Sequence, residues 1–171
     1  MRRRILFILA LPMMLAAAVW AASPALADSP HFISASATVS GTNLIVSWKE
    51  AGLGTNTLTS YTTTADATAT FVCVNGGNKN PRAANTTTVN GPVSASGTFP
   101  SGKNGNVTAS LTLTPPGPGG FSCPSGQKLE TAQVTYTNVA LTDTTNHIQA
   151  PLNPGPYSTG CLLPTVRGAC S

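Results

Sequence analysis

The segment Tyr61–Cys73, with the sequence YTTTADATATFVC, decides the fold that this chain is expected to adopt. Alternate positions carry tyrosine, threonine, three alanines, phenylalanine and cysteine, and most of the positions between them are threonine. Side chains of a β-strand point alternately to its two faces, so this period of two predicts a half-buried strand, or two strands joined by a bend. The small alanines on the apolar face indicate that a second layer approaches closely there.

The same period of two recurs before and after this segment. Alternating apolar residues predict further strands at residues 32–39, 43–48, 93–99, 107–113 and 132–141. Turns rich in glycine and proline separate these segments, and a slip in the alternation at Thr137–Asn138 predicts a β-bulge. No segment shows the three-to-four spacing of a helix, so the pattern predicts an all-β, antiparallel sandwich of about seven strands.

The first 27 residues have the organisation of a secretory signal peptide. Arg2–Arg4 form a positive start, an apolar segment runs from Ile5 to Trp20, and Ala25–Ala27 has the small residues of a cleavage site. The apolar segment is short for a membrane anchor and is interrupted by Pro12. We therefore expect a secreted, extracellular protein with no membrane span after cleavage. The very hydrophobic segment favours the general secretory route, and twin-arginine export through Arg3–Arg4 is the open alternative.

Removal of residues 1–27 changes the charge of the chain. The full sequence has a formal net charge of +4, and loss of the three leader arginines leaves about +1. The basic balance is therefore no sign of nucleic-acid binding, and we expect no nucleic-acid partner. The remaining residues have the length of one domain, which divides into a β-sandwich at 28–150 and an irregular, proline-rich tail at 151–171. We expect a monomer.

Cys73, Cys123, Cys161 and Cys170 form an even set in an exported chain, so disulfide bonds are expected. No Cys-x-x-Cys pair is present and the histidines lie far off in sequence, so we expect no metal site and no cofactor. Three pairings are possible, and we favour Cys73–Cys123 with Cys161–Cys170. On the loop-entropy model the longer link stabilises the fold by about 4 kcal/mol and the shorter link by roughly 2.7 kcal/mol.

The sequence offers little for catalysis. His31 follows the expected cleavage site closely, and His147 ends the turn-like sequence DTTNH. The five acidic residues show no pairing that would suit glycoside hydrolysis. Trp48 alternates in phase with Leu44 and Val46, which favours a place in the core over an exposed sugar-stacking platform. We therefore expect no catalytic residue and no enzymatic activity.

The C-terminal cysteines suggest a different kind of function, the binding of a partner by a disulfide-closed loop. If Cys161 and Cys170 are joined, they hold Leu163 and Arg167 in a small ring. A disulfide-closed loop loses little entropy on binding and can occupy a protease cleft, which makes Leu163 and Arg167 candidate binding residues. The favoured alternative is a staple that protects the end of a secreted chain.

Five segments carry a resemblance to a known group of proteins. They are SWKEAGLG at 47–54, FVCVNGGN at 71–78 followed by Pro81, CPSGQ at 123–127, VTYTNV at 134–139 and TDTTN at 142–146. Together these segments resemble small exported actinobacterial β-sandwich proteins of unassigned function. The resemblance implies an immunoglobulin-like sandwich and export, and it implies no activity. More distantly, GNVTASL at 105–111 is similar to neocarzinostatin-type apoproteins, which hold a small apolar chromophore in a cleft.

These observations together predict a secreted, non-catalytic β-sandwich that serves as a binding or structural module at or outside the cell envelope. Its partner would be an extracellular molecule or an envelope component. Two alternatives stay open at this point. One is a carrier of a small apolar ligand, of the chromophore-apoprotein type, and the other is a secreted protease inhibitor that uses the Cys161–Cys170 loop.

Overall fold

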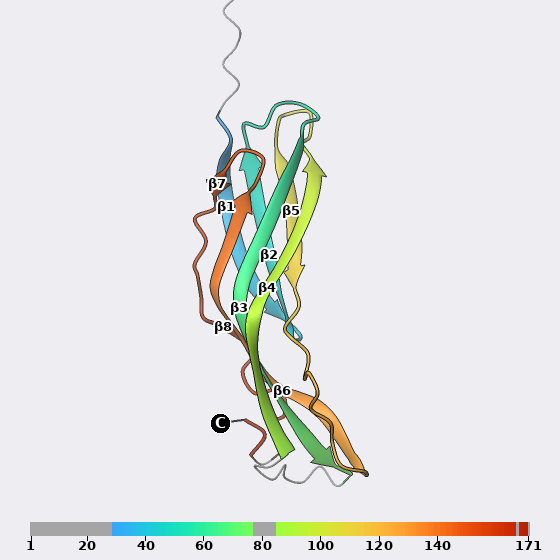
Figure 1. Cartoon of the computed structure of the whole chain (residues 1–171). Helices are drawn as coiled ribbons and strands as arrows, with labels where there is room; N and C mark the ends of the chain where they lie inside the picture. Colours follow the sequence, from blue (N-terminus) through green and yellow to red (C-terminus); the bar gives the residue numbers. More distant parts are fainter. Residues whose placement is uncertain (1–28, 77–84, 167, 171) are drawn as a thin grey trace, which may run out of the picture.

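The computed structural model describes residues 29–76, 85–166 and 168–170, and the expected signal peptide lies outside them. The described residues form strands, turns and loops and no α-helix, as the sequence predicts. Accordingly, this part of the chain contains no helix long and apolar enough to cross a membrane. Figure 1 shows an elongated molecule in which two sheets pack together over the upper part.

The sheets contain three and five strands, all antiparallel, so the predicted sandwich is confirmed. Sheet A has the order β1-β2-β5 and consists of β1 (His31–Ser40), β2 (Asn43–Ala51) and β5 (Val107–Leu113). Sheet B has the order β4-β3-β6-β7, with β8 also paired to β6, and consists of β3 (Leu58–Asn75), β4 (Thr86–Pro100), β6 (Gln127–Asp143), β7 (Ile148–Gln149) and β8 (Tyr157–Ser158).

The segment that decided the sequence prediction is one continuous strand. Within β3, every second residue from Tyr61 to Cys73 is buried, and the threonines and Asp66 on the other face are at least partly exposed. β3 pairs with β4 on one side and with β6 on the other over most of its length. It is therefore the central strand of sheet B, and its apolar face forms one wall of the core.

The β-bulge predicted at Thr137–Asn138 is also present. Thr64 pairs with Ala140 and Asp66 pairs with Thr137, so β6 has one residue more than β3 at this point. Asn138 has a φ of 54°, a left-handed conformation that asparagine tolerates better than most residues. The extra residue keeps the buried side chains on both sides of the bulge facing sheet A.

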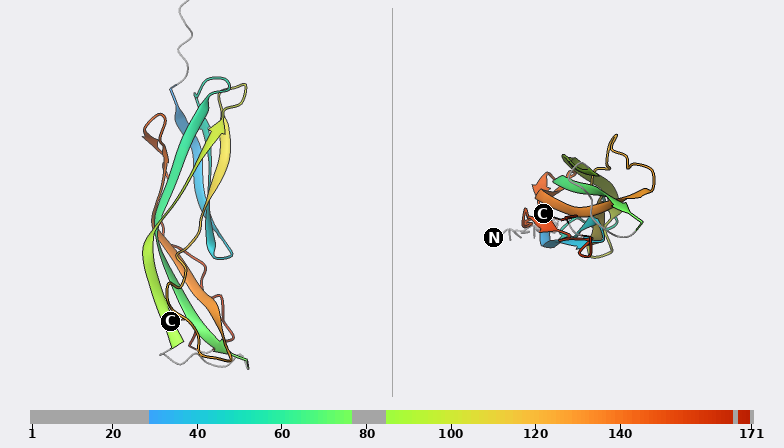
Figure 2. Two further views of the ribbon diagram at one scale, coloured as in Figure 1. Left: turned by 45° about the vertical axis from the view of Figure 1, so that its right-hand side comes forward. Right: turned by 90° about the horizontal axis from the view of Figure 1, so that it is seen from below.

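The core lies between the two layers, which are seen side by side in the left view of Figure 2. Its upper half is aromatic: the ring centroids of Trp48 and Tyr61 are 4.7 Å apart, and those of Trp48 and Phe99 are 5.5 Å apart. Trp48 is only 2% exposed, so the predicted core position is confirmed. Further down, the hydroxyl of Tyr136 on β6 donates to the carbonyl of Thr42 at 2.8 Å, which links the two sheets.

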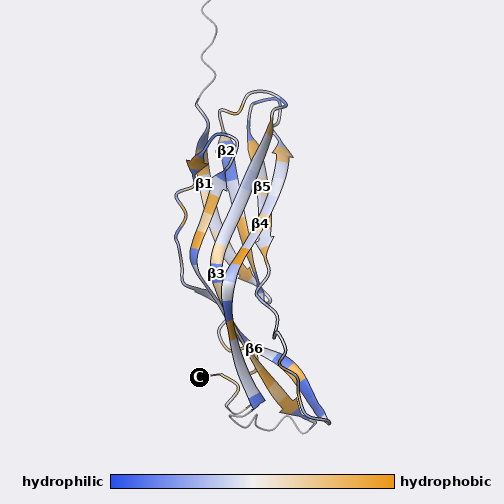
Figure 3. Ribbon diagram, in the orientation of Figure 1, coloured by the Kyte–Doolittle hydropathy of each residue, from blue (hydrophilic) through white to orange (hydrophobic). Residues whose placement is uncertain are grey.

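Sheet B continues downward beyond the end of sheet A, and this extension forms the lower tip of the molecule (Figures 1 and 2). At the lower end of β3 both faces are buried: Phe71 and Cys73 on one face, Val72 and Val74 on the other. The hydrophobic colouring of this end in Figure 3 reflects that run. A strand that buries both faces needs cover on both sides.

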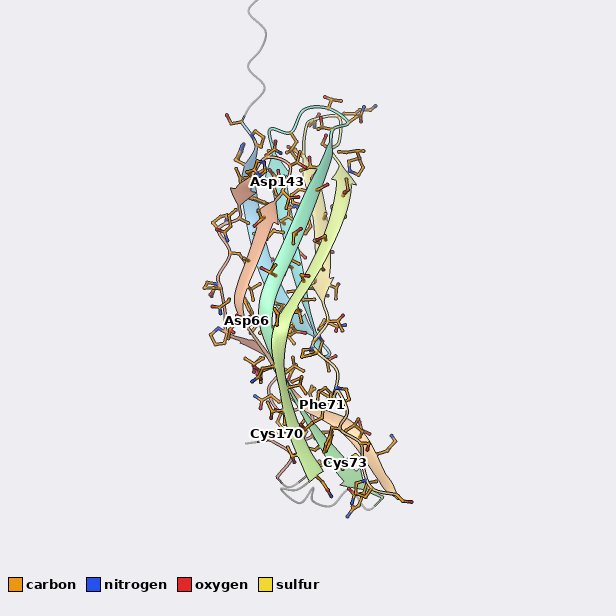
Figure 4. The ribbon with its side chains drawn as sticks, viewed as in Figure 1. Asp66, Phe71, Cys73, Asp143 and Cys170 are labelled. Carbon is orange, nitrogen blue, oxygen red and sulfur yellow. A yellow bond between two sulfur atoms is a disulfide. The ribbon has the colours of Figure 1, made fainter. Side chains whose placement is uncertain are left out.

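Two segments outside the main strands provide this cover. On one face, Cys73 is bonded to Cys123 in the loop that leads to β6, and Phe121 packs on the main core. On the other face, Val166 and Ala169 of the C-terminal ring pack against Val72, Val74 and Ala132. Figure 4 shows Phe71, Cys73 and Cys170 gathered at this tip.

Both favoured disulfide pairs are present. The bond between Cys73 and Cys123 spans 50 residues, and the bond between Cys161 and Cys170 spans 9. The shorter loop constrains the unfolded chain less, so its direct contribution to stability is smaller. The Cys161–Cys170 bond has a second role, because it closes the ring that packs against the tip of sheet B.

The proline-rich tail is irregular as predicted, yet it follows β6 closely. β7 and β8 each pair with β6, and prolines between them interrupt a continuous ladder. Additional backbone hydrogen bonds join the two segments at Ala150 N to Leu141 O, Val139 N to Pro154 O, Thr159 N to Val134 O and Leu162 N to Ala132 O. The tail therefore covers an edge of sheet B that would otherwise be open.

Gly97 on β4 leaves the space that the aromatic core needs. A Cβ atom at this position would lie 2.9 Å from Cε2 of Phe99 and 3.2 Å from Cδ2 of Leu111. Gly91 faces the same side of β4 and has no atom within 4 Å of the corresponding point. The two glycines therefore differ in packing although they share a strand and a face.

We expect Gly97→Ala to lower the free energy of unfolding by about 1–3 kcal/mol, because the ring of Phe99 must move from its place beside Trp48. Gly91→Ala is the matched control and should be neutral or stabilising by about 0.5 kcal/mol. Urea denaturation of both variants measures the difference. Equal effects of the two substitutions would contradict this view of the core.

Candidate functional site

The disulfide-closed ring at 161–170 lies folded against the tip of sheet B. Two turns shape it: the amide of Val166 donates to the carbonyl of Leu163 at 3.0 Å, and the amide of Ala169 donates to that of Val166 at 3.1 Å. Val166 and Ala169 are 6% and 2% exposed. The ring is thus a docked cover, and two of its apolar side chains are committed to packing.

Of the two candidate binding residues, the structure describes Leu163 and does not describe Arg167. Leu163 is partly buried, packs on the lower apolar cluster and lines a cleft beside the ring. Arg167 lies outside the described residues. The structure therefore brings Leu163 into a hollow at the tip, which the sequence alone did not predict.

This tip cleft has a volume of about 500 Å³ and lies between the ring, the end of β3 and the start of β6. Val74, Leu163 and Val166 give it an apolar wall. Lys128 and Glu130 line it as well and form an ion pair at 3.2 Å. An apolar wall beside a few polar groups is the usual composition of a site for a small ligand or for one side chain of a partner.

A second feature lies at the opposite end of the sandwich, where polar side chains are buried between the sheets. Glu50 and Asp143 are both 0% exposed, and Thr59 and Tyr61 are buried with them. Figure 4 shows Asp143 at this upper end, far from the tip. Sequence reasoning found no pair of carboxyl groups, yet the fold buries two at the same end of the core.

Most polar atoms of this buried cluster lack a well-placed partner within the protein. Among the described residues, the buried side-chain atoms without a partner in good hydrogen-bonding geometry are Trp48 Nε1, both carboxyl oxygens of Glu50, Thr59 Oγ1 and the Tyr61 hydroxyl. Leaving a buried polar group unpaired is costly, and leaving a charge unpaired is more so. The ionised form of Glu50 is therefore strongly disfavoured here.

Burial raises the pKa of Glu50 from 4.5 to about 7. The hydroxyl of Tyr61 opposes this rise, and the nearby carboxylate of Asp143 adds to it. Burial likewise raises the pKa of Tyr61 above its usual value, and the proximity of Glu50 raises it further. The cluster thus holds a carboxyl group that changes its charge near neutral pH without being open to solvent.

Asp143 itself is well paired by the turn that follows it. Its Oδ1 accepts hydrogen bonds from the amides of Thr145 and Asn146 at 2.8 and 2.9 Å, and its Oδ2 accepts one from Asn146 Nδ2 at 2.6 Å. His147 ends this turn, exposed and with a φ of 57°. The turn predicted from DTTNH is therefore present, and Asp143 stabilises it.

Neither histidine joins a cluster of potential metal ligands. The Nδ1 atom of His31 lies 2.8 Å from the carbonyl of Ser29, and the side chain is exposed. In the part of the chain that the structure describes, no three His, Cys, Asp or Glu side chains come together in a way that could hold a metal ion. Comparison of the chain with protein-family models, curated proteins and solved structures found no match in any of the three.

The buried carboxyl groups had a signal in the sequence. Glu50 continues the inward series of Leu44, Val46 and Trp48 with the same period of two, and Asp143 continues the series of Val139 and Leu141. Extending each alternation by one step places both side chains between the sheets. The tip cleft had no comparable signal, because it depends on where the ring docks.

We expect the wild-type protein to lose stability as the pH rises from about 4.5 to above 7. The unfolded chain releases the Glu50 proton near pH 4.5 whereas the folded protein holds it until about pH 7, so the benefit of the protonated group is complete below pH 4.5. The loss is on the order of 3 kcal/mol at most. Thermal unfolding measured at intervals across this pH range tests the expected loss of stability.

Glu50→Gln removes the titrating group and keeps its size, so the difference in stability between wild type and this variant should change across the same range. Glu130→Gln, at the tip, is the control and should leave the pH profile of the wild type unchanged. A profile for Glu50→Gln that runs parallel to wild type throughout would rule out Glu50 as the source.

Proposed function

We propose that the protein is a secreted, non-catalytic binding module that acts at or outside the cell envelope and that the tip cleft is its ligand site. The observation that carries this proposal is the docking of the ring, which turns Leu163, Val166 and Val74 into the wall of a hollow with the Lys128–Glu130 pair beside it. The partner is an extracellular molecule or an envelope component. The protein acts as a monomer with an immunoglobulin-like sandwich, as the resemblance to exported actinobacterial proteins implies.

Two disulfide bonds support the extracellular part of the proposal. Bonds of this kind persist in oxidising compartments and are rare in reducing ones. Both cysteine pairs are joined, and no cysteine of the described residues is left free. The chemistry of the chain therefore suits an oxidising environment, which agrees with the expected signal peptide.

The placement of the acidic groups supports a non-catalytic role. A general acid or base must come within hydrogen-bond distance of the reacting group. Glu50 and Asp143 are fully buried, and Asp143 is occupied by its turn. Glu130 is committed to an ion pair with Lys128. No two exposed carboxyl groups of the described residues therefore stand out as a catalytic pair.

The carrier alternative needs an apolar cleft between the sheets. That space is filled by side chains such as Trp48, Tyr61 and Tyr136, each at most 2% exposed. The inhibitor alternative needs ring side chains that are free to enter a protease. Val166 and Ala169 are buried against sheet B, and the turns at Leu163 and Val166 fold the ring back. Both observations favour the tip cleft.

Substitution of Thr165, an exposed residue that lines the cleft, tests the proposal without disturbing the core. We expect Thr165→Arg to block the hollow and to reduce retention of the mature protein on cell-wall and culture-supernatant components, freed of acidic polysaccharide, at least fivefold. Retention is measured by pull-down of each fraction, with circular dichroism to confirm folding.

Thr64→Arg is the matched control, because Thr64 is an exposed threonine on the outer face of sheet B and does not line the tip cleft. This variant should be retained on each fraction to the same extent as the wild type. Wild-type retention that survives Thr165→Arg, or that falls equally in both variants, would remove the tip cleft as the binding site.

A further inference from the structure

The outer face of sheet A carries a hollow of about 550 Å³ that no part of the proposed function uses. Lys49 lies at its centre on β2, paired in register with Ser34 of β1 and Thr108 of β5. The next outward row places Ser47 between Ser36 and Ser110. Five hydroxyl groups therefore surround one ammonium group on a three-stranded surface.

These hydroxyl groups differ from those on the outer face of sheet B. On sheet B, side-chain hydroxyls bond to one another across strands, as in Ser60–Thr98 and Thr62–Ser96, both at 2.8 Å. Among the described residues, Lys49 and the five hydroxyl side chains around it make no side-chain hydrogen bond to another protein group. Their donors and acceptors are available to a ligand.

A second hollow of about 350 Å³ continues this surface toward the upper loops. Ala51, at the end of β2, and Asn106, just before β5, line it. Each lies two residues from Lys49 or Thr108, or about 7 Å further along the chain. Lys103 lies on its loop side. The two hollows together form a band along β2, with Lys49 in one part and Lys103 in the other.

The charges along this band have one sign. Of the three lysines that the structure describes, Lys128 is paired with Glu130 at the tip, and Lys49 and Lys103 have no ion pair. No acidic side chain lines either hollow. The remaining described acids lie elsewhere: Glu50 and Asp143 are buried, and Asp66 bonds to Asn138 on sheet B.

We propose that this band, the outer face of sheet A together with the adjoining loop hollow, binds an anionic polysaccharide that lies along β2. The two separated ammonium groups match acidic groups that recur along such a chain. The serine, threonine and asparagine side chains between them match its sugar hydroxyls, which donate and accept hydrogen bonds in the same way. A neutral glycan leaves both lysines without a partner, and a polyanion without hydroxyls leaves the hydroxyl array unused.

This band is separate from the tip cleft, since the two share no lining residue. Blocking the cleft with Thr165→Arg should leave polysaccharide binding by the band unchanged. Failure of one proposal is therefore distinguishable from failure of the other.

The test is an NMR titration of the isotopically labelled mature protein with three probes of similar length: an oligogalacturonate, a neutral maltooligosaccharide and a linear polyphosphate. We expect the oligogalacturonate to shift the amides of β1, β2 and β5 around Lys49, with affinity that falls as salt rises. We expect Lys49→Gln and Lys103→Gln each to lower the affinity for oligogalacturonate about three- to fivefold. The double variant should lower it by about tenfold or more.

Lys128→Gln is the matched control, because it removes the same charge from outside the band, and it should leave the affinity read from the sheet A amides within about twofold of wild type. The proposal is overturned if oligogalacturonate shifts no amide of sheet A, or if Lys128→Gln weakens binding as much as Lys49→Gln. Equal binding of polyphosphate would overturn the polysaccharide assignment, and equal binding of the maltooligosaccharide would overturn the role of the lysines.

Discussion

β3 runs past the end of sheet A, and the lower part of the molecule is built around the need to cover it. Where the strand faces sheet A, alternation alone buries one side and leaves the other to solvent. At its lower end Phe71, Val72, Cys73 and Val74 are consecutive buried residues, so both faces need a cover that a two-layer sandwich does not supply. Loop and tail segments provide it, and each is fixed by one disulfide bond. The tip cleft exists because one of these covers, the ring, stands beside the strand ends.

The upper and lower parts are therefore stabilised in different ways. Above, aromatic and aliphatic side chains from two sheets form an ordinary hydrophobic core, joined at its lower end by the Tyr136 hydrogen bond to Thr42. Below, a small cluster around Val72 and Val74 depends on a ring that has little regular structure. Conformational entropy opposes the ordering of such a segment, and a covalent link reduces that cost by restricting the unfolded chain.

Much of this architecture follows from the sequence, and the rest depends on contacts between distant residues. The alternation in Tyr61–Cys73, the bulge at Asn138 and the core position of Trp48 are local patterns, and the structure confirms each. Glu50 was overlooked although its phase in β2 places it inward. The edge role of the tail, the need for glycine at Gly97 and the tip cleft arise only when separate segments meet. No local pattern encodes them.

Amide hydrogen exchange along β3 tests most directly whether the ring keeps the tip ordered. Removal of the ring bond by Cys161→Ser with Cys170→Ser should raise exchange at Val72–Asn75 at least tenfold, while Tyr61–Ala69 stay protected as in the wild type. Unchanged exchange at the tip, or an equal rise along the whole of β3, would contradict the account.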